Sequence, residues 1–275
     1  MKKHSAQYKS SAFCLLFNEP DKLRSLYNAL TGSSYGEETP VTITTLKNEL
    51  TVGLRNDISF TIGDKTIVLL EHQSTINPNM PLRFLLYVAT IFENRINRRD
   101  LYSKQKMKIP QPEFYLFYNG ISDFPDKTTL KLSDSFAETD KEAEHFLDLK
   151  VIAYNINVGY NKELMDKIRD LDEYARFVDV VRKKRAKETD LEEAFRLAIK
   201  ECIDNNILRD FLEKYGEEVM NSLLNISWEE YVEIHREEAR EEEKLETAQR
   251  LKAMGLSPAQ ISEGTGLSQE KVEKL

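Results

Sequence analysis

Residues 67–75 read IVLLEHQST, and this stretch decides the fold. The aliphatic run 67–70 gives both faces of an extended segment an apolar start, which is typical of a central strand covered on both sides. The run then changes to Glu71, His72 and Gln73. Because strand side chains alternate, Glu71 and Gln73 share one face about 7 Å apart, and His72 lies on the other. The sequence therefore predicts a buried strand, residues 66–73, that ends in a carboxylate and an amide.

The position of Asp57 relative to this strand depends on one turn. Residues 57–62 alternate polar and apolar side chains, and Gly63-Asp64-Lys65 separates them from the strand 66–73, so the two segments form a predicted β-hairpin. With a two-residue turn, position 57 pairs with 70 and Asp57 points away from Glu71. With a three-residue turn or a bulge, position 57 pairs with 71, and the two carboxylates lie about 5 Å apart at their β-carbons. We predict that Asp57 faces Glu71.

Two carboxylates at the end of a covered sheet repel each other, and a divalent cation offsets this cost. Oxygen ligands suit Mg²⁺ or Mn²⁺, and Mg²⁺ typically takes one or two carboxylates together with waters and substrate phosphate. Such a metal lowers the pKa of a bound water and polarises a phosphoryl group. Gln73 could orient the water or a phosphate oxygen, but it cannot act as a general base or carry positive charge. The residues alone leave open the alternative that Asp57 and Glu71 are solvated residues at the rim of the sheet.

The rest of the chain alternates between helical and extended patterns. Apolar residues recur at helical spacing in three regions, which are residues 11–30, about 79–97 and 161–228. Runs rich in β-branched and aromatic residues predict further strands at residues 41–45, 113–118 and 147–156. This order predicts an α/β domain with a mixed central sheet flanked by helices, followed by a helical C-terminal region.

Changes in pattern also predict the domain organisation. We expect a core at 1–160, a helical extension packed on it at 161–232, a charged helix or linker at 233–246, and a tail at 247–275. In the tail, Gly255 ends one predicted helix, Ser257-Pro258 starts the next, and Ser268 caps a third. This arrangement is similar to a small helix-turn-helix unit, which could contact DNA or a protein partner.

Composition limits the classes of protein to which the chain can belong. The 275 residues are 40% hydrophobic and carry a net charge of -8, which argues weakly against a protein that coats DNA. No apolar stretch is long enough to cross a bilayer, and MKKHSAQYKS at the start has no apolar segment typical of a signal peptide. The two cysteines, Cys14 and Cys202, do not make a disulfide framework or a zinc site. We expect a cytoplasmic protein without membrane association.

Several segments together resemble one nuclease superfamily. They are Asn56-Asp57-Ile58-Ser59-Phe60, Leu70-Glu71-His72-Gln73-Ser74-Thr75, Asn79-Met80-Pro81-Leu82-Arg83 and Pro112-Glu-Phe-Tyr-Leu-Phe-Tyr-Asn-Gly120. Their joint pattern resembles the PD-(D/E)XK nuclease superfamily and, more narrowly, its recombination-promoting nuclease (Rpn) and transposase family. The resemblance covers about residues 8–232 and is densest between 54 and 120.

The resemblance implies a restriction-endonuclease-like core and a metal-dependent DNA endonuclease that hydrolyses phosphodiester bonds. It implies that Asp57 and Glu71 bind Mg²⁺ or Mn²⁺, with the backbone carbonyl of His72 as a further ligand. Gln73 stands where the superfamily usually has a lysine. Family members commonly carry an acidic residue and a Phe-Lys pair in the first helix, whereas Ser10-Ser11-Ala12-Phe13-Cys14 has neither the acid nor the lysine. These departures predict a weakly active enzyme, and the alternative is an inactive nuclease-fold protein that binds DNA or a protein partner.

Basic residues after the hairpin are candidates for DNA contact. Arg83 and Tyr87 are four residues apart on a predicted helix, so they share a face and could meet a phosphate. The alternative is that Arg83 pairs with a carboxylate in the core and Tyr87 packs. Three arginines begin a basic stretch that could follow the DNA backbone or could form a solvated face, namely Arg95, Arg98 and Arg99. Nucleases that cut both strands commonly dimerise, so a homodimer is expected by analogy.

Overall fold

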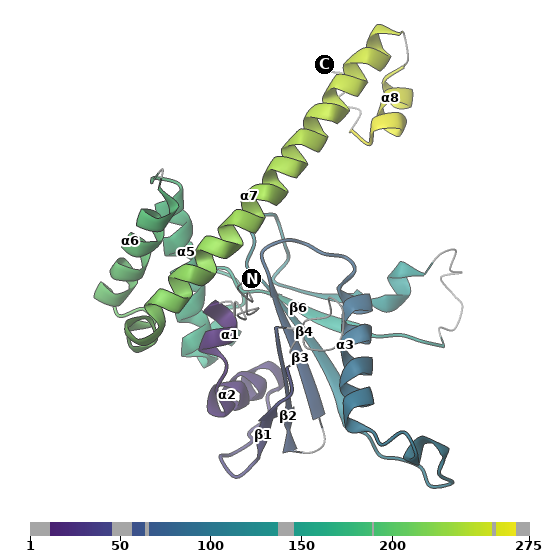
Figure 1. The fold of residues 1–275 in the computed structure, drawn as a ribbon, viewed down its shortest axis with the longest axis vertical. Coiled ribbons are helices and arrows are strands. Elements are labelled where there is room, and N and C mark those ends of the chain that lie inside the picture. Colours follow the sequence, from purple (N-terminus) through teal and green to yellow (C-terminus); the bar gives the residue numbers. More distant parts are fainter. Residues whose placement is uncertain are drawn as a thin grey trace, which may run out of the picture. The chain divides into compact units, whose positions relative to one another are not determined.

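The computed structural model describes residues 12–45, 57–63, 66–136, 146–188, 190–254 and 257–267. Six strands form one mixed sheet in the order β1-β2-β3-β4-β6-β5 (Figure 1). Their bounds are β1 Val41–Ile43, β2 Ile58–Ile62, β3 Thr66–Gln73, β4 Gln111–Tyr118, β5 Lys127–Lys131 and β6 Lys150–Asn155. The pairs β3/β4 and β4/β6 are parallel, and the other three pairs are antiparallel. The predicted α/β class with a mixed central sheet is confirmed.

The β2–β3 hairpin has the register that the three-residue connection predicts. Ile62 pairs with Thr66 and Ile58 pairs with Leu70, so continuing the register places position 57 opposite position 71. The prediction that Asp57 faces Glu71 is therefore confirmed at the level of backbone pairing. Since register fixes which face every side chain of a strand occupies, this pairing controls the chemistry at the end of β3.

Helices cover both faces of the sheet, which explains why β3 is apolar on both sides. Helix α3, Met80–Arg95, lies over one face, and α1, Ala12–Leu16, and α2, Pro20–Thr31, lie over the other (Figure 1). On the α3 face, Leu69 of β3 packs in one buried cluster with Phe84 of α3 and Phe114 of β4. Burying a side chain of this size contributes roughly 1.5–3 kcal/mol. β3 is the central strand that the aliphatic run predicted.

The parallel pairing of β3 and β4 places the end of β3 beside the start of a helix. The chain leaves β3, forms α3 and returns as β4, which is a β-α-β crossover unit. Ligands of open α/β sheets bind outside the carboxyl ends of such parallel strands. Glu71 and Gln73 therefore lie at the edge of the sheet where binding sites are commonly built.

One strand was missing from the sequence prediction. β5 reads KTTLK, lies at the edge of the sheet, and pairs only with β6 within the described part of the chain. Its residues alternate between exposed and half-buried, so no apolar run marks it. The predicted order of five strands was wrong because a short polar edge strand takes its stability from its neighbour rather than from its own hydrophobicity.

The C-terminal region is helical, as predicted. It contains α4 Lys162–Lys167, α5 Arg169–Arg185, α6 Leu191–Asp204, α7 Arg209–Ala253 and α8 Pro258–Thr265. The chain divides into two compact units, residues 1–222 and 223–275. The predicted boundaries at 232/233 and 246/247 both fall within α7.

The tail has local order that its sequence predicts. Ser257 caps α8 in a capping box with Gln260, and Gly266 ends the helix in a left-handed conformation. Ala248, Ile261 and Leu267 form a small buried cluster. The predicted roles of Gly255 and of Ser268 fall outside the described residues.

Within the described part of the chain, none of the helices combines the length and the apolar character that crossing a bilayer demands.

Candidate functional site

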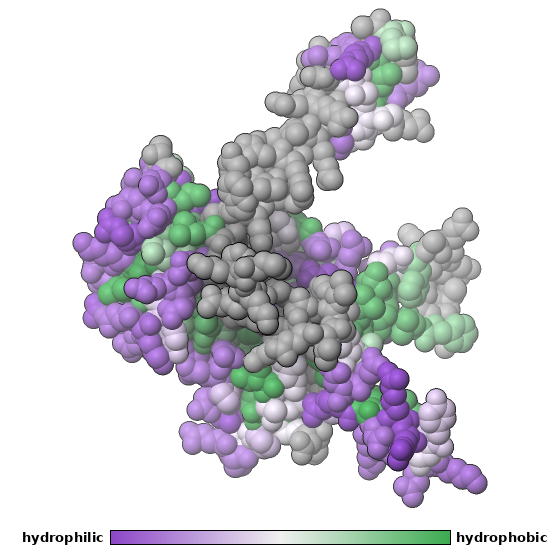
Figure 2. All heavy atoms as spheres, in the orientation of Figure 1, coloured by the Kyte–Doolittle hydropathy of each residue, from purple (hydrophilic) through white to green (hydrophobic). Residues whose placement is uncertain are grey.

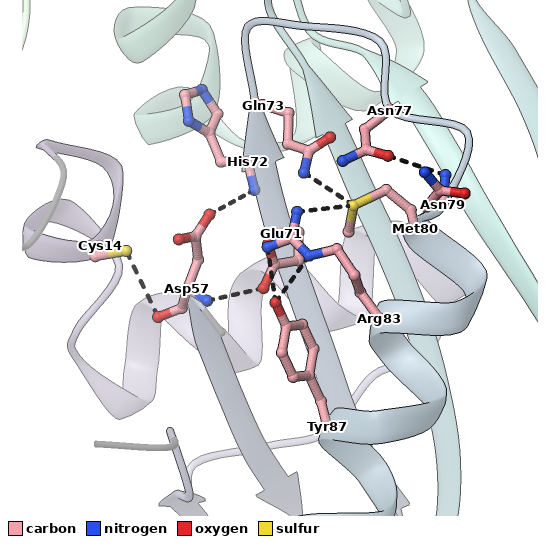
Figure 3. Close-up of polar contacts among 10 residues, drawn as sticks. All are labelled: Cys14, Asp57, Glu71, His72, Gln73, Asn77, Asn79, Met80, Arg83 and Tyr87. Atoms are coloured by element: carbon pink, nitrogen blue, oxygen red, sulfur yellow. Dashed lines mark hydrogen bonds and ion pairs between the residues drawn. The ribbon is translucent and has the colours of Figure 1, made fainter. Parts of the chain in front are cut away.

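The two predicted carboxylates meet at the open end of the β2–β3 hairpin (Figure 3). The backbone N–H of Asp57 donates to Oε1 of Glu71 at 3.0 Å, and the N–H of His72 donates to Oδ2 of Asp57 at 2.8 Å. Each carboxylate is therefore anchored to the backbone of the neighbouring strand. Glu71 is 2% exposed and Asp57 is partly buried, so Glu71 is part of the core and not of the solvated rim.

The backbone N–H and C=O of residue His72 point to the same side of β3. In a strand, the N–H and C=O of one residue point toward the same neighbour. The His72 N–H reaches Asp57 on the β2 side, whereas the carbonyl of Gln73 accepts from Asn119 after β4. The His72 carbonyl therefore points toward the β2 side, where Asp57 lies, and its assignment as a metal ligand stays a prediction.

Burial and mutual repulsion make the carboxylate pair unusually basic. Burial, with the neighbouring charge of Asp57 as the second cause, raises the pKa of Glu71 from 4.5 to about 8, although Arg83 and a backbone hydrogen bond oppose this shift. Burial also raises the pKa of Asp57, against the effects of the His72 N–H and Arg83. Two buried acids that resist ionisation are the arrangement that a bound cation would relieve.

This pKa shift predicts that Glu71 lowers the stability of the metal-free protein as pH rises. The native state holds the Glu71 proton up to about pH 8, whereas the unfolded state loses it near pH 4.5. Between these values the native state binds more protons, so the contribution of Glu71 is favourable at low pH and is lost as pH rises. Relative to Glu71→Gln, we expect the free energy of unfolding in EDTA to fall by up to roughly 1 kcal/mol per pH unit between pH 5 and pH 8. Urea unfolding of both proteins measures this, and a difference that is constant with pH would contradict it.

Arg83 and Tyr87 lie directly over the pair, on the first turns of α3 (Figure 3). Nη2 of Arg83 is 3.3 Å from Oε2 of Glu71. The hydroxyl of Tyr87 accepts from Nε and Nη2 of Arg83 at 3.0 and 2.7 Å. The structure thus shows the pairing of Arg83 with a core carboxylate, and it leaves the arginine side chain 36% exposed. Contact of Arg83 with a phosphate stays a prediction.

Gln73 joins the same cluster through Met80, the first residue of α3. Sδ of Met80 accepts from Nε2 of Gln73 at 2.9 Å and from Nη1 of Arg83 at 3.3 Å. Oε1 of Gln73 is buried and has no hydrogen-bond partner among the residues that the structure describes. A buried carbonyl oxygen without a donor costs about 1–3 kcal/mol, so this atom marks a place that favours a ligand or an ordered water.

His72 lies on the opposite face of the sheet, as predicted, inside an aromatic cluster. Its ring stacks on Phe13 of α1 with 4.9 Å between centroids, and its Nε2 is 3.3 Å from the hydroxyl of Tyr174 of α5. Burial, with the charge of Arg182 as a second cause, lowers the pKa of His72 to about 3. The neutral ring is a structural anchor for the peptide that holds Asp57.

Three residues that were predicted to contact DNA lie away from the carboxylate pair. Arg95 ends α3, about 18 Å along the helix axis from Arg83 at the usual rise. Arg98 and Arg99 lie in the segment after α3, which projects as a hydrophilic surface (Figure 2), and Arg98 forms an ion pair with Glu93. These residues are exposed, so they could still contact DNA away from the site.

The residues present fit a divalent cation of the magnesium type. In the described part of the chain, no group of three or more His, Cys, Asp or Glu side chains is placed to hold a metal ion. Mg²⁺ does not require such a cage, because one or two carboxylates, waters and substrate phosphate complete its shell. The buried pair, the adjacent unpartnered Gln73 oxygen and the peptide of His72 supply an oxygen-only donor set of this kind.

Sequence reasoning did not assign roles to Met80, Phe13 or Tyr174. Met80 belongs to the Met-Pro-Leu-Arg segment, and its place at the helix start after β3 was the signal that could have identified it. Phe13 and Tyr174 come from helices far away in the sequence, and nothing in their local pattern connects them with His72.

Comparison with known proteins identifies the family. The family model described as "Putative transposase, YhgA-like" matches residues 54–223. Comparisons with curated proteins and with solved structures gave no match. The matched region contains the hairpin that holds the carboxylate pair, α3 and strands β2 to β6, and it leaves out β1. Because the model covers more than half of the chain, the protein belongs to the family of YhgA-like transposases, whose name indicates a transposase-like role.

Proposed function

We propose that the chain is a metal-dependent DNA endonuclease that hydrolyses phosphodiester bonds. The observation that carries this proposal is the register of β2 and β3, which brings the partly buried Asp57 and the buried Glu71 together, each anchored by a backbone N–H, under Arg83. Membership in a transposase-like family supports DNA as the substrate. Mg²⁺ is the proposed cofactor, with Mn²⁺ as its substitute.

Each residue of the site has a defined task under this proposal. Asp57, Glu71 and the His72 carbonyl would hold the cation, which when bound supplies an acidified water and a polarised phosphoryl group. The Gln73 amide would orient the attacking water or a phosphate oxygen. Arg83, steadied by Tyr87, would bind the phosphate, since a guanidinium offers a planar fork of donors.

A plasmid assay tests the proposal. Supercoiled DNA incubated with the protein and Mg²⁺ or Mn²⁺ should become nicked, and EDTA should prevent this. Asp57→Asn and Glu71→Gln should abolish the cleavage. Equal background cleavage by the wild type and both variants would overturn the proposal and would favour a nuclease-fold protein that binds DNA or a partner.

The same assay examines the proposed homodimer. Two copies acting on opposite strands would produce linear plasmid at a rate that rises with the square of the protein concentration, whereas nicking alone would rise linearly. Cytoplasmic localisation follows from a DNA substrate within the cell, and fractionation of cells expressing the protein would test it.

The role of Gln73 leads to a separate prediction. Its amide is held by Met80 with one oxygen unpartnered, so it is suited to orienting a small ligand and not to carrying charge. We expect Gln73→Ala to lower the cleavage rate about 10- to 100-fold, a typical effect for a group that positions reactants. The affinity for Mn²⁺ should change less than about threefold, because the carboxylates remain.

Gln105→Ala is the matched control, since Gln105 is exposed on the segment after α3. It should cleave as the wild type does. If Gln73→Ala also cleaves as the wild type does, the amide has no role in orienting the reactants.

A further inference from the structure

Both oxygens of Glu71 already have partners. Oε1 accepts from the backbone N–H of Asp57 at 3.0 Å, and Oε2 lies 3.3 Å from Nη2 of Arg83. The Asp57 contact belongs to the hairpin backbone and holds the side chain in place. The Arg83 contact comes from a side chain that is 36% exposed and can move without disturbing the sheet. A cation that enters between the carboxylates therefore meets the Arg83 charge first.

Arg83 has a second set of partners that does not include the carboxylates. The Tyr87 hydroxyl accepts from Nε and Nη2, and Sδ of Met80 accepts from Nη1. Both partners lie on α3 itself, within one turn of Arg83. If the contact with Glu71 is lost, these partners keep the guanidinium near the carboxylates instead of releasing it into solvent.

We propose that Arg83 is an exchangeable counter-ion for the carboxylate pair. In the metal-free protein its Nη2 occupies Oε2 of Glu71. When a divalent cation occupies the pair, Arg83 leaves Oε2, stays tethered by Tyr87 and Met80, and turns its free donors toward the substrate phosphate. This inference rests on the proposed nuclease function. It implies that metal binding, by freeing Arg83, comes before tight DNA binding.

Electrostatics predict the direction in which removal of the Arg83 charge changes the affinity for a metal ion. Two positive groups that compete for one carboxylate oxygen repel each other, and the repulsion at a few ångströms remains substantial at the intermediate dielectric of a half-buried site. Removing the Arg83 charge should therefore tighten metal binding. If Arg83 served only to hold Glu71 in position, its removal would loosen the ligand and weaken metal binding. The two roles thus predict opposite changes.

Binding of Mn²⁺ without DNA, measured by electron paramagnetic resonance of the free ion at low ionic strength, separates the two roles. Arg83→Met keeps the length and apolar stem of the side chain and removes its charge. We expect it to bind Mn²⁺ about tenfold more tightly than the wild type, a moderate value because the side chain is partly exposed. Arg98→Met is the matched control, because it removes the same charge in the segment after α3. It should change the affinity less than about twofold.

A second measurement tests whether Arg83 contacts DNA once a metal ion is bound. With Ca²⁺ as a cation, DNA affinity measured by fluorescence anisotropy should rise on metal addition in the wild type and should rise about tenfold less in Arg83→Met, because one charge-assisted phosphate contact is lost. Tyr87→Phe keeps the charge but removes the tether. It should leave Mn²⁺ affinity near that of the wild type and reduce the metal-dependent gain in DNA affinity.

The outcomes distinguish failure of this inference from failure of the proposed function. If the wild type binds Mn²⁺ no better than Asp57→Asn and Glu71→Gln, the metal site itself is refuted. If the wild type binds Mn²⁺ through these carboxylates but Arg83→Met binds it equally or more weakly, the nuclease proposal stands and the exchange role of Arg83 is overturned. Unfolding by urea confirms that each variant is folded.

Discussion

Replacing Asp57 with Asn or Glu71 with Gln is expected to lower metal-dependent DNA cleavage by about 10³-fold or to background, which corresponds to roughly 4 kcal/mol of lost transition-state stabilisation. Both substitutions preserve shape and remove one of the two negative charges proposed to hold the cation. The hairpin contacts should survive, because an amide oxygen can still accept the Asp57 or His72 backbone N–H that each carboxylate accepts now.

Stability distinguishes this loss of function from unfolding. The carboxylates are buried close together, and burial raises the pKa of both. Replacing a buried charge with a neutral group of similar size is commonly neutral or stabilising. We therefore expect the metal-free Glu71→Gln protein to be at least as stable as the wild type at pH 8, although it is inactive.

Glu113→Gln provides the matched control for these two variants. Glu113 lies on β4, the strand next to β3, and its carboxylate accepts hydrogen bonds from Tyr27 and Tyr115. The variant makes the same chemical change in the same sheet but away from the hairpin end. It should retain cleavage within about threefold, since it removes no proposed ligand. Loss of cleavage in all three variants would show that activity reports general damage to the sheet.

Replacing Phe13 with Ala is expected to have the largest effect on stability, about 3–5 kcal/mol. The ring is fully buried, and it packs on Phe17, His72, Phe117 and Tyr174 with centroid separations of 4.8, 4.9, 5.9 and 5.4 Å. Its removal leaves a cavity between α1, β3, β4 and α5 that rigid neighbouring rings cannot fill. Urea unfolding should show a lower midpoint with an unchanged slope, because the surface exposed on unfolding changes little.

Two control variants allow the stability change of Phe13→Ala to be interpreted. Phe13→Leu retains an apolar side chain and should cost less than about 2 kcal/mol. Tyr102→Ala removes an aromatic ring that is 90% exposed and should change stability by less than about 0.5 kcal/mol. A cost for Phe13→Ala as small as that for Tyr102→Ala would mean that α1 does not pack on the sheet.

The Phe13 result also bears on the site. The first helix lacks the acid and the lysine that the family resemblance led us to expect, yet it still contacts the site. Phe13 supports the His72 ring, and Sγ of Cys14 donates to the carbonyl of Asp57 at 3.5 Å. The helix therefore contributes packing and a backbone contact in place of charge.

Local patterns were sufficient for much of the fold and for the members of the carboxylate pair. The aliphatic run of β3, the alternation of β2 and the helical spacing of α3 are properties of short segments, and such periodicities directly report which faces are buried. The edge strand β5 was missed because its sequence carries little of this signal. Arg95, Arg98 and Arg99 were proposed as DNA contacts because they cluster in the sequence, and such clustering does not give their distance from the carboxylates.

The sequence by itself determined that Glu71 and Gln73 share one strand face, that His72 opposes them, and that Asp57 could reach Glu71 in only one of two registers. Tertiary structure alone decided that Arg83 lies on Glu71, that Met80 joins Gln73 to Arg83, and that Phe13 and Tyr174 hold His72. The physical reason is the range of the forces involved. Alternation and turn length act between neighbours in the chain, whereas ion pairs and aromatic packing join residues that only the completed fold brings within a few ångströms.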